Sequence, residues 1–290
     1  MNRPGIQTAT VVAAVTPADV PAPSPEIDES LVASYDRYYA TGYYHSRYPA
    51  PNPRTAGTLL GLVGTAGRVL DFGCGDGRYV PPLLTRPGVT AVGYDVCPTA
   101  LRLFSERFAP EIAAGRVAGL GGGIDQLEAY AAEHGRFDVA LLGFGVLGHI
   151  RGRHRRQQTL AAIRRVLAPG GRLLLGLPNA HRRFGPEQKA ARREIEAGRL
   201  EPGDIAYSRI APGGDGRETI SLYYHLYSGP DIATELAAGG FRIVACTAES
   251  VLPESGVVRS PLGAALDAVL TRITPLRWAY GFLVTAAPVD

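Results

Sequence analysis

A buried strand that runs directly into a glycine-rich turn constrains the fold of this chain more than any other feature. Residues 68–72 (Arg-Val-Leu-Asp-Phe) are typical of a buried strand, and Gly73, Gly75 and Gly77 follow it within five positions. Glycine allows backbone conformations that other residues avoid and lets a ligand approach the backbone closely. The helix expected after such a turn begins with unpaired N–H groups that favour a polar or anionic ligand. The pattern predicts a ligand-binding loop at the end of a strand.

The same order of strand, loop and helix repeats further along the chain. Apolar runs predict strands at residues 89–94, 137–142 and 172–177, and helical spacing predicts helices at 99–108 and 157–167. Alternating strands and helices form a parallel sheet that is covered on both faces, with ligands at the carboxyl ends of its strands. One crevice is therefore expected to be lined by the loops that follow Asp71, Tyr94, Leu120 and Leu142.

The C-terminal part departs from simple alternation. A hairpin is predicted around a Gly-Gly-Asp-Gly turn, with strands at residues 204–210 and 219–227. The elements predicted after it are a helix at 228–238, a strand at 241–247, a helix at 261–273 and a strand at 280–286. We expect the last two strands to pair as an antiparallel hairpin at the edge of the sheet. Residues 178–227 form an insertion that is expected to act as a small substrate cap.

The N-terminal segment divides into two parts. Residues 1–30 are rich in Ala, Pro, Thr and Val and lack periodicity, which predicts a disordered leader. A tyrosine-rich block follows at residues 35–48. It is interpreted either as a helix that packs its rings on the core or as a lid over a ligand, and the number of hydroxyl groups favours the lid. The remaining residues, 31–290, are expected to form one domain.

Composition excludes several classes of protein. The chain has 290 residues, 46% hydrophobic and 20% charged, enough for one full core. No apolar run approaches the roughly 20 residues of a membrane helix, and no secretory signal is recognised. Three scattered cysteines lack the spacing of a disulfide framework or a zinc site, so a metal-free protein in a reducing cytoplasm is expected. The net charge of +3 rests almost entirely on arginine and does not by itself indicate nucleic acid.

An acid beside the turn narrows the choice of ligand. Asp71 lies at the strand end, two residues before the first glycine, where a carboxylate can meet a ligand ammonium group. The competing dinucleotide fingerprint, G-x-G-x-x-G, needs a small residue where this chain has Arg78. The pair of observations favours a cofactor that carries an amino acid over one that carries a pyrophosphate.

Residues 69–77, Val-Leu-Asp-Phe-Gly-Cys-Gly-Asp-Gly, resemble the first motif of the class I S-adenosylmethionine-dependent methyltransferases. Asp95 matches the acid that accepts the ribose hydroxyls in that family. Residues 137–145 resemble its fourth motif, and residues 167–173 resemble its turn into the fifth strand. The resemblance implies an α/β fold with a Rossmann-like, seven-stranded, mostly parallel sheet, helices on both faces and an antiparallel edge hairpin. It also implies methyl transfer with S-adenosylmethionine as the cofactor.

The resemblance carries a set of cofactor-binding residues onto this chain: Asp71, Gly73, Cys74, Gly75, Gly77, Asp95, Val96, Ile124, Gly143 and Phe144. The family often has an aspartate after the third strand that contacts the adenine amino group. Here the stretch is Gly-Gly-Gly-Ile-Asp, so either Asp125 serves in a shifted register or the backbone of Ile124 holds the adenine alone. The second interpretation is favoured.

Two histidines are candidates for a general base, which some acceptors need. His149 follows the fourth strand, and it either acts on the acceptor or packs against the next helix. His225 lies in a predicted strand whose alternation turns Tyr223, His225 and Tyr227 to one face and Tyr224 to the other. The residues expected to contact the acceptor are Tyr39, Arg47, Tyr48 and Tyr224.

The sequence leaves three interpretations of the function open, and two of them differ in the acceptor. The favoured one is a small molecule or natural product. The alternative is tRNA, because residues 46–49, 75–79 and 223–227 resemble parts of the wobble-uridine carboxymethyl methyltransferases, and an arginine-rich stretch at 151–199 is suited to phosphates. The remote third interpretation is a cofactor-binding protein without catalysis. The sequence does not decide whether a partner subunit is needed.

Overall fold

The computed structural model describes residues 28–213 and 216–289. The predicted leader therefore lies outside the described residues up to position 27. Its last residues, 28–30, instead open helix α1 (Glu29–Ala40), because the Asp28 carboxylate accepts hydrogen bonds from the backbone N–H groups of Ser30 and Leu31. Within the described ranges, no helix has both the length and the apolar character needed to cross a bilayer.

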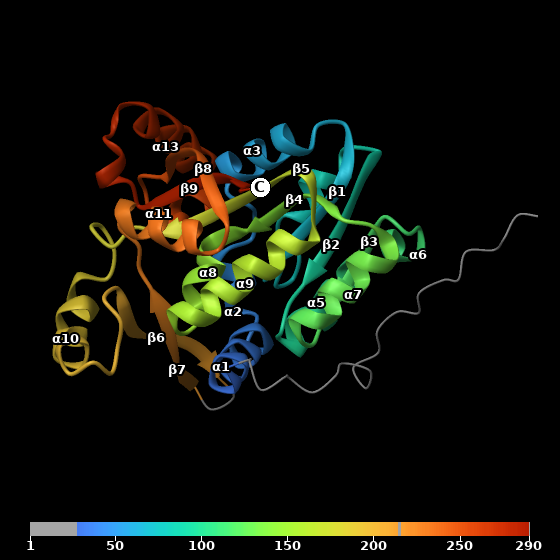
Figure 1. Cartoon of the computed structure of the whole chain (residues 1–290). Coiled ribbons are helices and arrows are strands. Elements are labelled where there is room, and N and C mark those ends of the chain that lie inside the picture. Colours follow the sequence, from blue (N-terminus) through green and yellow to red (C-terminus); the bar gives the residue numbers. More distant parts are fainter. Residues whose placement is uncertain (1–27, 214–215, 290) are drawn as a thin grey trace, which may run out of the picture.

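A seven-stranded sheet forms the centre of the molecule, in the order β3-β2-β1-β4-β5-β9-β8 (Figure 1). The strands are β1 (Ala66–Phe72), β2 (Gly88–Tyr94), β3 (Val117–Leu120), β4 (Phe137–Leu142), β5 (Leu167–Pro178), β8 (Phe241–Ser250) and β9 (Gly281–Pro288). The first five pair in parallel, and β9 runs antiparallel to both β5 and β8. The predicted mostly parallel sheet with an antiparallel edge hairpin is confirmed.

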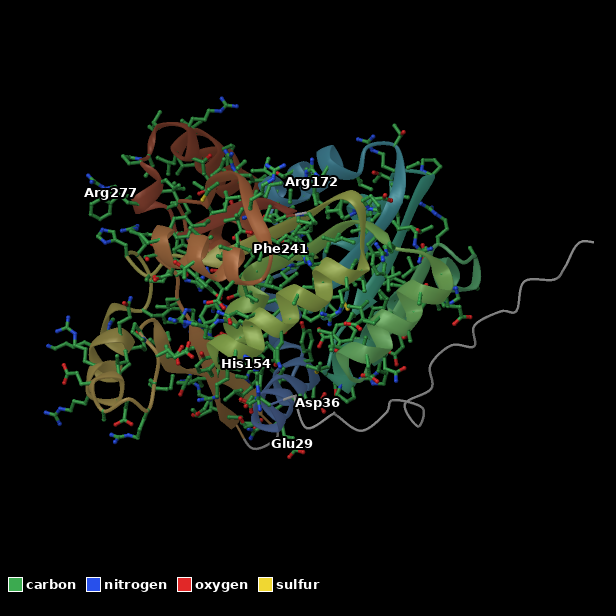
Figure 2. All side chains as sticks on the ribbon, in the orientation of Figure 1. Glu29, Asp36, His154, Arg172, Phe241 and Arg277 are labelled. Carbon is green, nitrogen blue, oxygen red and sulfur yellow. The ribbon has the colours of Figure 1, made fainter. Side chains whose placement is uncertain are left out.

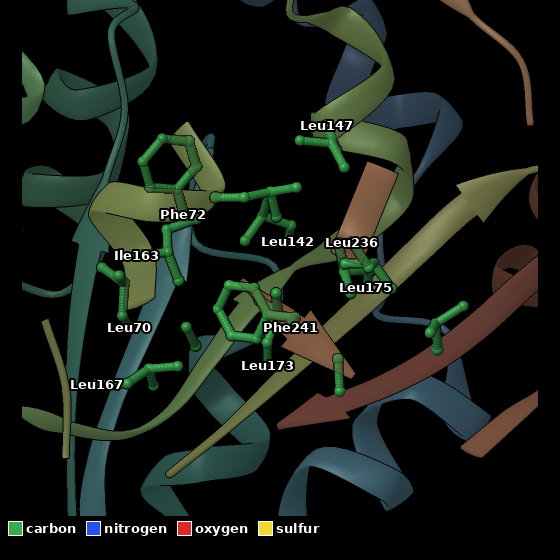
Figure 3. Packing of buried hydrophobic residues seen from close by; sticks show 14 of the residues in the cluster. Leu70, Phe72, Leu142, Leu147, Ile163, Leu167, Leu173, Leu175, Leu236 and Phe241 are labelled. Carbon is green, nitrogen blue, oxygen red and sulfur yellow. The ribbon is translucent and has the colours of Figure 1, made fainter. Parts of the chain in front are cut away.

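Helices cover both faces of the sheet, as the alternation predicts. One face carries α7 (Ile124–His134), α9 (Arg153–Val166) and α11 (Gly229–Ala238), and the other carries α3 (Pro53–Val63), α4 (Val80–Leu84) and α5 (Pro98–Arg107). Successive side chains of a strand point to opposite faces. Leu70 of β1 accordingly packs with Ile163 on the first face, whereas its neighbour Val69 packs with Phe104 on the second. Figure 3 shows the first of these two apolar layers.

The insertion after β5 forms a separate unit beside the sheet (Figure 1). It consists of α10 (Gly185–Glu196) and an antiparallel pair of strands, β6 (Asp204–Gly213) and β7 (Gly216–His225). Helix α1 packs on β7 and on α5, so it connects this unit with the central domain. The remaining elements are α2 (Tyr43–Arg47), α6 (Ala109–Ala113), η1 (Gly143–Gly145), α8 (Val146–His149), α12 (Glu254–Arg259), α13 (Pro261–Ile273) and η2 (Leu276–Trp278).

Several strands are longer than predicted, and one of these differences affects the site. Strand β5 begins at Leu167 rather than Arg172, and β8 continues past Thr247 to Ser250. The pairing of β8 with β9 shifts register twice, between Ile243 and Ala245 and again near its end. Such bulges change which way the following side chains point. The extension places Glu249 on the side of the sheet where the carboxyl ends of the parallel strands lie.

Candidate active site

A cavity of about 500 Å³ lies at the carboxyl ends of β1, β2 and β4, where the sequence predicted a crevice. The strand ends contribute Asp71, Phe72, Gly73, Cys74, Tyr94, Asp95, Val96, Gly143 and Phe144 to its wall. Tyr35, Tyr39, Tyr44 and His149 contribute from α1, α2 and α8. Its volume is within the range of sites for small ligands.

The glycine loop takes backbone conformations that only glycine adopts without strain. Gly73 and Gly75 have φ angles of 73° and 57°. A Cβ at Gly73 would lie 2.6 Å from Val146, and a Cβ at Gly75 would overlap the hydroxyl of Tyr39. Tyr39 therefore rests directly on the loop, which explains why Gly75 is not itself part of the cavity wall. Gly77 is likewise absent from the wall and packs against the Phe104 ring, so its role in this structure is packing.

Asp71 is almost completely buried, with 2% of its surface exposed. Its Oδ2 atom has no hydrogen-bond partner within residues 28–213 and 216–289. Burial raises the pKa of this carboxyl from 3.8 to about 7. The attraction of Arg78 opposes this shift, and repulsion from Asp95 and Asp76 adds to it. A buried carboxylate without a partner is costly, so the site is suited to a cationic ligand group.

Asp95 is held in place by the backbone on both sides. Its Oδ2 accepts a hydrogen bond from Gly75 N at 2.8 Å, and its Oδ1 accepts one from Cys97 N at 2.9 Å. Burial raises its pKa, while these hydrogen bonds act in the opposite direction. The carboxylate thus forms part of the cavity wall in a fixed orientation, with further lone pairs available to hydroxyl donors.

Helix α1 lies across the cavity and is anchored to three parts of the chain. Asp36, labelled in Figure 2, accepts a hydrogen bond from Thr99 N at 2.9 Å, and Asp28 pairs with Arg151 at 3.1 Å. Arg37 pairs with Glu218 on β7 at 3.2 Å. In the tyrosine block, Tyr35, Tyr39 and Tyr44 line the cavity, while Tyr38 packs on the hairpin.

His149 faces the cavity, but both of its ring nitrogens are engaged. Nδ1 lies 3.0 Å from the carbonyl oxygen of Tyr223, and Nε2 lies 2.8 Å from the hydroxyl of Tyr35. A carbonyl can only accept, so Nδ1 carries the proton and Nε2 accepts from Tyr35. Burial lowers the pKa of His149 to about 4, and the ring stacks on Tyr224 at 4.2 Å. The imidazole is therefore neutral at pH 7 and orients the Tyr35 hydroxyl.

The structure places His225 away from the cavity, where the catalytic interpretation expected it to lie. Its side chain is buried on the far side of β7 and does not belong to the cavity wall. Nδ1 lies 2.7 Å from Asp204 Oδ1, which also accepts a 2.6 Å hydrogen bond from the Tyr223 hydroxyl. Strand alternation had placed Tyr223 and His225 on one face correctly, but that face is turned away from the ligand. Glu201, Asp204 and His225 lie close enough to share a cation, although Glu201 already pairs with Arg156 at 2.8 Å.

The four residues expected to contact the acceptor separate into two groups. Tyr39 belongs to the cavity wall. Tyr48, Arg47 and Tyr224 form the layer behind it: the Tyr48 ring packs against Phe144 at 4.5 Å, Arg47 donates to the Tyr48 hydroxyl at 3.0 Å, and Tyr224 stacks on His149. Ile124 is in the wall, whereas Asp125 is exposed and outside it.

Sequence reasoning missed two features of this site. Tyr35 was seen only as part of the tyrosine block, and its contact with His149 spans 114 residues. Arg78 was used only as an argument against a dinucleotide, yet it is buried and belongs to the cavity wall, with its guanidinium 4.5 Å from the centre of the Phe144 ring. The position of Arg78 directly after the glycine loop was the one signal that could have indicated this role.

The order of the Rossmann-like sheet, with a glycine loop between the buried Asp71 and the partly buried Asp95, resembles that of the class I S-adenosylmethionine-dependent methyltransferases. A family model described as a methyltransferase domain matches residues 69–171, the segment that holds the loop, both acids and β4. The matched segment is thus a methyltransferase domain, as its motifs implied. No curated protein has a sequence that matches it.

Solved structures of methyltransferases share the fold. The CcbJ methyltransferase from Streptomyces caelestis is 15% identical, with a TM-score of 0.60 over 83% of this chain and 90% of that one. The glycopeptide N-methyltransferase MtfA, solved with sinefungin, is 20% identical, with a TM-score of 0.54 over 83% and 88%. The 1,6-didemethyltoxoflavin-N1-methyltransferase from Burkholderia thailandensis, solved with its acceptor and S-adenosylhomocysteine, is 20% identical, with a TM-score of 0.54 over 93% and 94%.

Proposed function

We propose that this methyltransferase acts on a small-molecule acceptor and that the acids of the cavity hold the amino-acid and ribose parts of S-adenosylmethionine. Asp71 pairs with the cofactor ammonium group, because its buried Oδ2 has no hydrogen-bond partner among the residues that the structure describes. Asp95 accepts the ribose hydroxyls with the lone pairs that Gly75 and Cys97 leave free. The adenine lies against Val96 and Ile124, and Gly73, Cys74, Gly143 and Phe144 complete the wall.

The bound cofactor supplies an activated methyl group, so the protein mainly has to align the acceptor and exclude water. In this proposal α1 acts as the lid: Tyr39 rests on the glycine loop, and the Tyr35 hydroxyl is oriented by His149. His149 is assigned a positioning role, because a buried imidazole whose pKa is lowered to about 4 is a poor base at neutral pH. The insertion at 178–227 serves as the cap, since its Tyr224 stacks on His149.

The intramolecular contacts of the arginines in residues 151–199 favour a small acceptor over tRNA. Several of its side chains are engaged within the chain: Arg151 with Asp28, Arg156 with Glu201 and Glu235, Arg165 with Glu128, and Arg199 with Glu194. Arg164 and Arg172 donate to backbone carbonyls, and Arg183 packs on aromatic rings. Arginines committed in this way offer fewer charges to a phosphate backbone. A small acceptor is also what the enclosing helix α1 accommodates.

A structural neighbour also supports a small-molecule acceptor, because the 1,6-didemethyltoxoflavin-N1-methyltransferase is solved with 1,6-didemethyltoxoflavin bound. A cytoplasmic location is part of the proposal, in keeping with three cysteines that are free thiols.

Methyl-labelled S-adenosylmethionine distinguishes the two acceptor classes. Purified protein is incubated with tRNA from a strain lacking the gene, with tRNA from its parent, and with the small-metabolite fraction of each strain. The proposal expects label in the small metabolites of the deletion strain. Label that enters deletion-strain tRNA, and little that enters parental tRNA, would establish the RNA alternative instead. Calorimetry with the cofactor confirms in parallel that the protein used is able to bind it.

A further inference from the structure

Helix α13 turns its apolar side to solvent. Four large apolar residues, spaced four, three and four positions apart, follow one side of this helix: Leu262, Leu266, Val269 and Ile273. Their exposed fractions are 83%, 53%, 53% and 72%. Leu276 and Trp278 of the following η2 are also exposed, by 37% and 41%. These six residues form the α13 face.

The one acid of the same helix is turned inward. Asp267 is 4% exposed, and its Oδ1 accepts hydrogen bonds from Val251 N and Leu252 N, each at 2.8 Å. Ser260 caps the start of the helix by accepting a hydrogen bond from Gly263 N at 3.2 Å. A surface helix normally buries its apolar stripe and exposes its polar side. The reverse arrangement, fixed at two places, indicates a contact surface.

Exposed apolar side chains are concentrated in this part of the molecule. Of the ten large apolar side chains that are exposed in the described residues, six belong to the α13 face. Two more, Ile243 and Val244, lie on β8, which α13 contacts. Figure 1 shows α13 at the outer margin of the molecule, and the cavity wall includes no described residue after Arg165. The α13 face is therefore separate from the methyltransferase site.

The exposed charges around the α13 face are all positive. Residues 241–289 contain three acids, and all of them are buried: Glu249, Glu254 and Asp267. The arginines of the same range are all exposed: Arg242, Arg259, Arg272 and Arg277, the last labelled in Figure 2. Helix α3, which contacts α13 through Arg54 and Thr271, contains no acid. A partner that complements this surface is apolar where it meets the helix and negatively charged around it.

These charges argue against a second copy of the chain as the partner. A two-fold contact brings the same surface of two copies together. The arginines of one copy would then face those of the other, and residues 241–289 offer no exposed acid to separate them. Like charges brought together in this way are unfavourable. The shape points away from a peptide as well, because side chains as exposed as Leu262 form a ridge and not a groove.

We propose that the α13 face binds the surface of an anionic lipid bilayer, with α13 lying in the plane of the interface. The aliphatic side chains enter the boundary of the acyl chains, and Trp278 lies at the level of the headgroups. The surrounding arginines meet the anionic headgroups. A helix of 13 residues supplies a contact about 20 Å long. Such a helix lies on a bilayer without spanning it, and the proposal goes beyond the proposed function because it involves no residue of the cavity.

The fluorescence of Trp278 tests the proposal directly, because it is the only tryptophan of the chain. Full-length protein is titrated with vesicles of phosphatidylcholine, and with vesicles of phosphatidylcholine and phosphatidylglycerol in equal amounts. With the anionic vesicles we expect a shift of the emission to shorter wavelength and sedimentation of the protein with the lipid. Binding to the neutral vesicles should be at least about tenfold weaker. Added salt should weaken binding to the anionic vesicles.

Variants separate the apolar and the charged parts of the contact. Leu262→Gln combined with Ile273→Gln should weaken binding to anionic vesicles by about 30-fold or more. Arg272→Gln combined with Arg277→Gln should weaken it by about tenfold or more at low salt. Ile210→Gln is the matched control, since Ile210 is 57% exposed on β6, and it should bind like the wild type. Circular dichroism checks that each variant keeps its fold.

The other possible occupants give different results. A dimer in sedimentation velocity that Leu262→Gln with Ile273→Gln converts to a monomer, without vesicle binding by the wild type, would assign the face to a second copy. Emission of a buried indole from the free monomer would show that another part of the chain covers the face. Either result overturns the proposal. So does equal binding to neutral and anionic vesicles, no binding to either, or wild-type binding by the double apolar variant. None of these measurements depends on methyl transfer, so they stand or fall separately from the proposed function.

Discussion

The buried carboxyl of Asp71 allows a prediction in which stability and cofactor affinity change in opposite directions. Its pKa is raised from 3.8 to about 7 in the folded chain, so the folded state holds a proton that the unfolded state releases between these two pH values. The free energy of unfolding therefore falls as the pH rises from about 4 to about 7 and is constant above that range. The pKa difference corresponds to about 4 kcal/mol.

Asp71→Asn removes this cost because the amide has nearly the same shape and no charge. We expect the cofactor-free variant to be more stable than the wild type at pH 8 by up to about 4 kcal/mol, and equally stable at pH 4. Its cofactor affinity should fall, because the ammonium group loses its charged partner. A loss of about 2–4 kcal/mol corresponds to a Kd roughly 30- to 1000-fold higher.

Urea unfolding at pH 4, 6 and 8 measures the first effect, and calorimetry with S-adenosylmethionine at pH 8 measures the second. Asp125→Asn is the matched control, since this acid is exposed and outside the cavity wall. It should change stability by no more than about 0.5 kcal/mol. A less stable Asp71→Asn protein at pH 8, or a difference from the wild type that does not grow with pH, would refute the argument that Asp71 is an unpartnered buried acid.

Three further predictions concern the other groups of the site. Asp95→Ala should weaken cofactor binding by about 2–4 kcal/mol in calorimetry, and an unchanged Kd would remove Asp95 from the ribose site. Tyr35→Phe should lower kcat about tenfold with little change in cofactor Kd, because His149 loses the hydroxyl it orients; a wild-type kcat would show that this contact is only structural. His225→Ala should lower the free energy of unfolding by about 2–4 kcal/mol, because it removes a buried side chain and one of the hydrogen bonds to the buried Asp204 carboxylate, while kcat per folded molecule stays the same. A selective loss of kcat would restore the catalytic interpretation.

The glycine loop and both acids were predictable because the signals are local. A strand, a turn and the start of a helix follow one another in the chain, so Asp71 and Gly73 are placed by the nearest few residues. Asp95 follows from a second strand of the same kind, because the carboxyl ends of parallel strands meet at one edge. The cavity wall contains both acids, as expected.

The position of His225 relative to the cavity was not predictable from the sequence. Alternation along a strand shows which residues share a face, but not what that face meets. His225 and Tyr223 do share one, and it is turned toward Asp204. The direction depends on how the β6–β7 hairpin is placed against α8 and α9, and no short pattern in the sequence encodes that.

The sequence by itself determined the alternation of strands and helices, the edge of the sheet that binds the ligand, and the acids beside the glycine loop. These features depend on the period of apolar residues and on turn chemistry, which act over a few residues. Only the tertiary structure decided that Tyr35 meets His149 and that Thr55 meets Glu249, across 114 and 194 residues of chain. Such contacts depend on strand register, on the bulges of β8 and on helix placement, which are settled by the packing of the whole core.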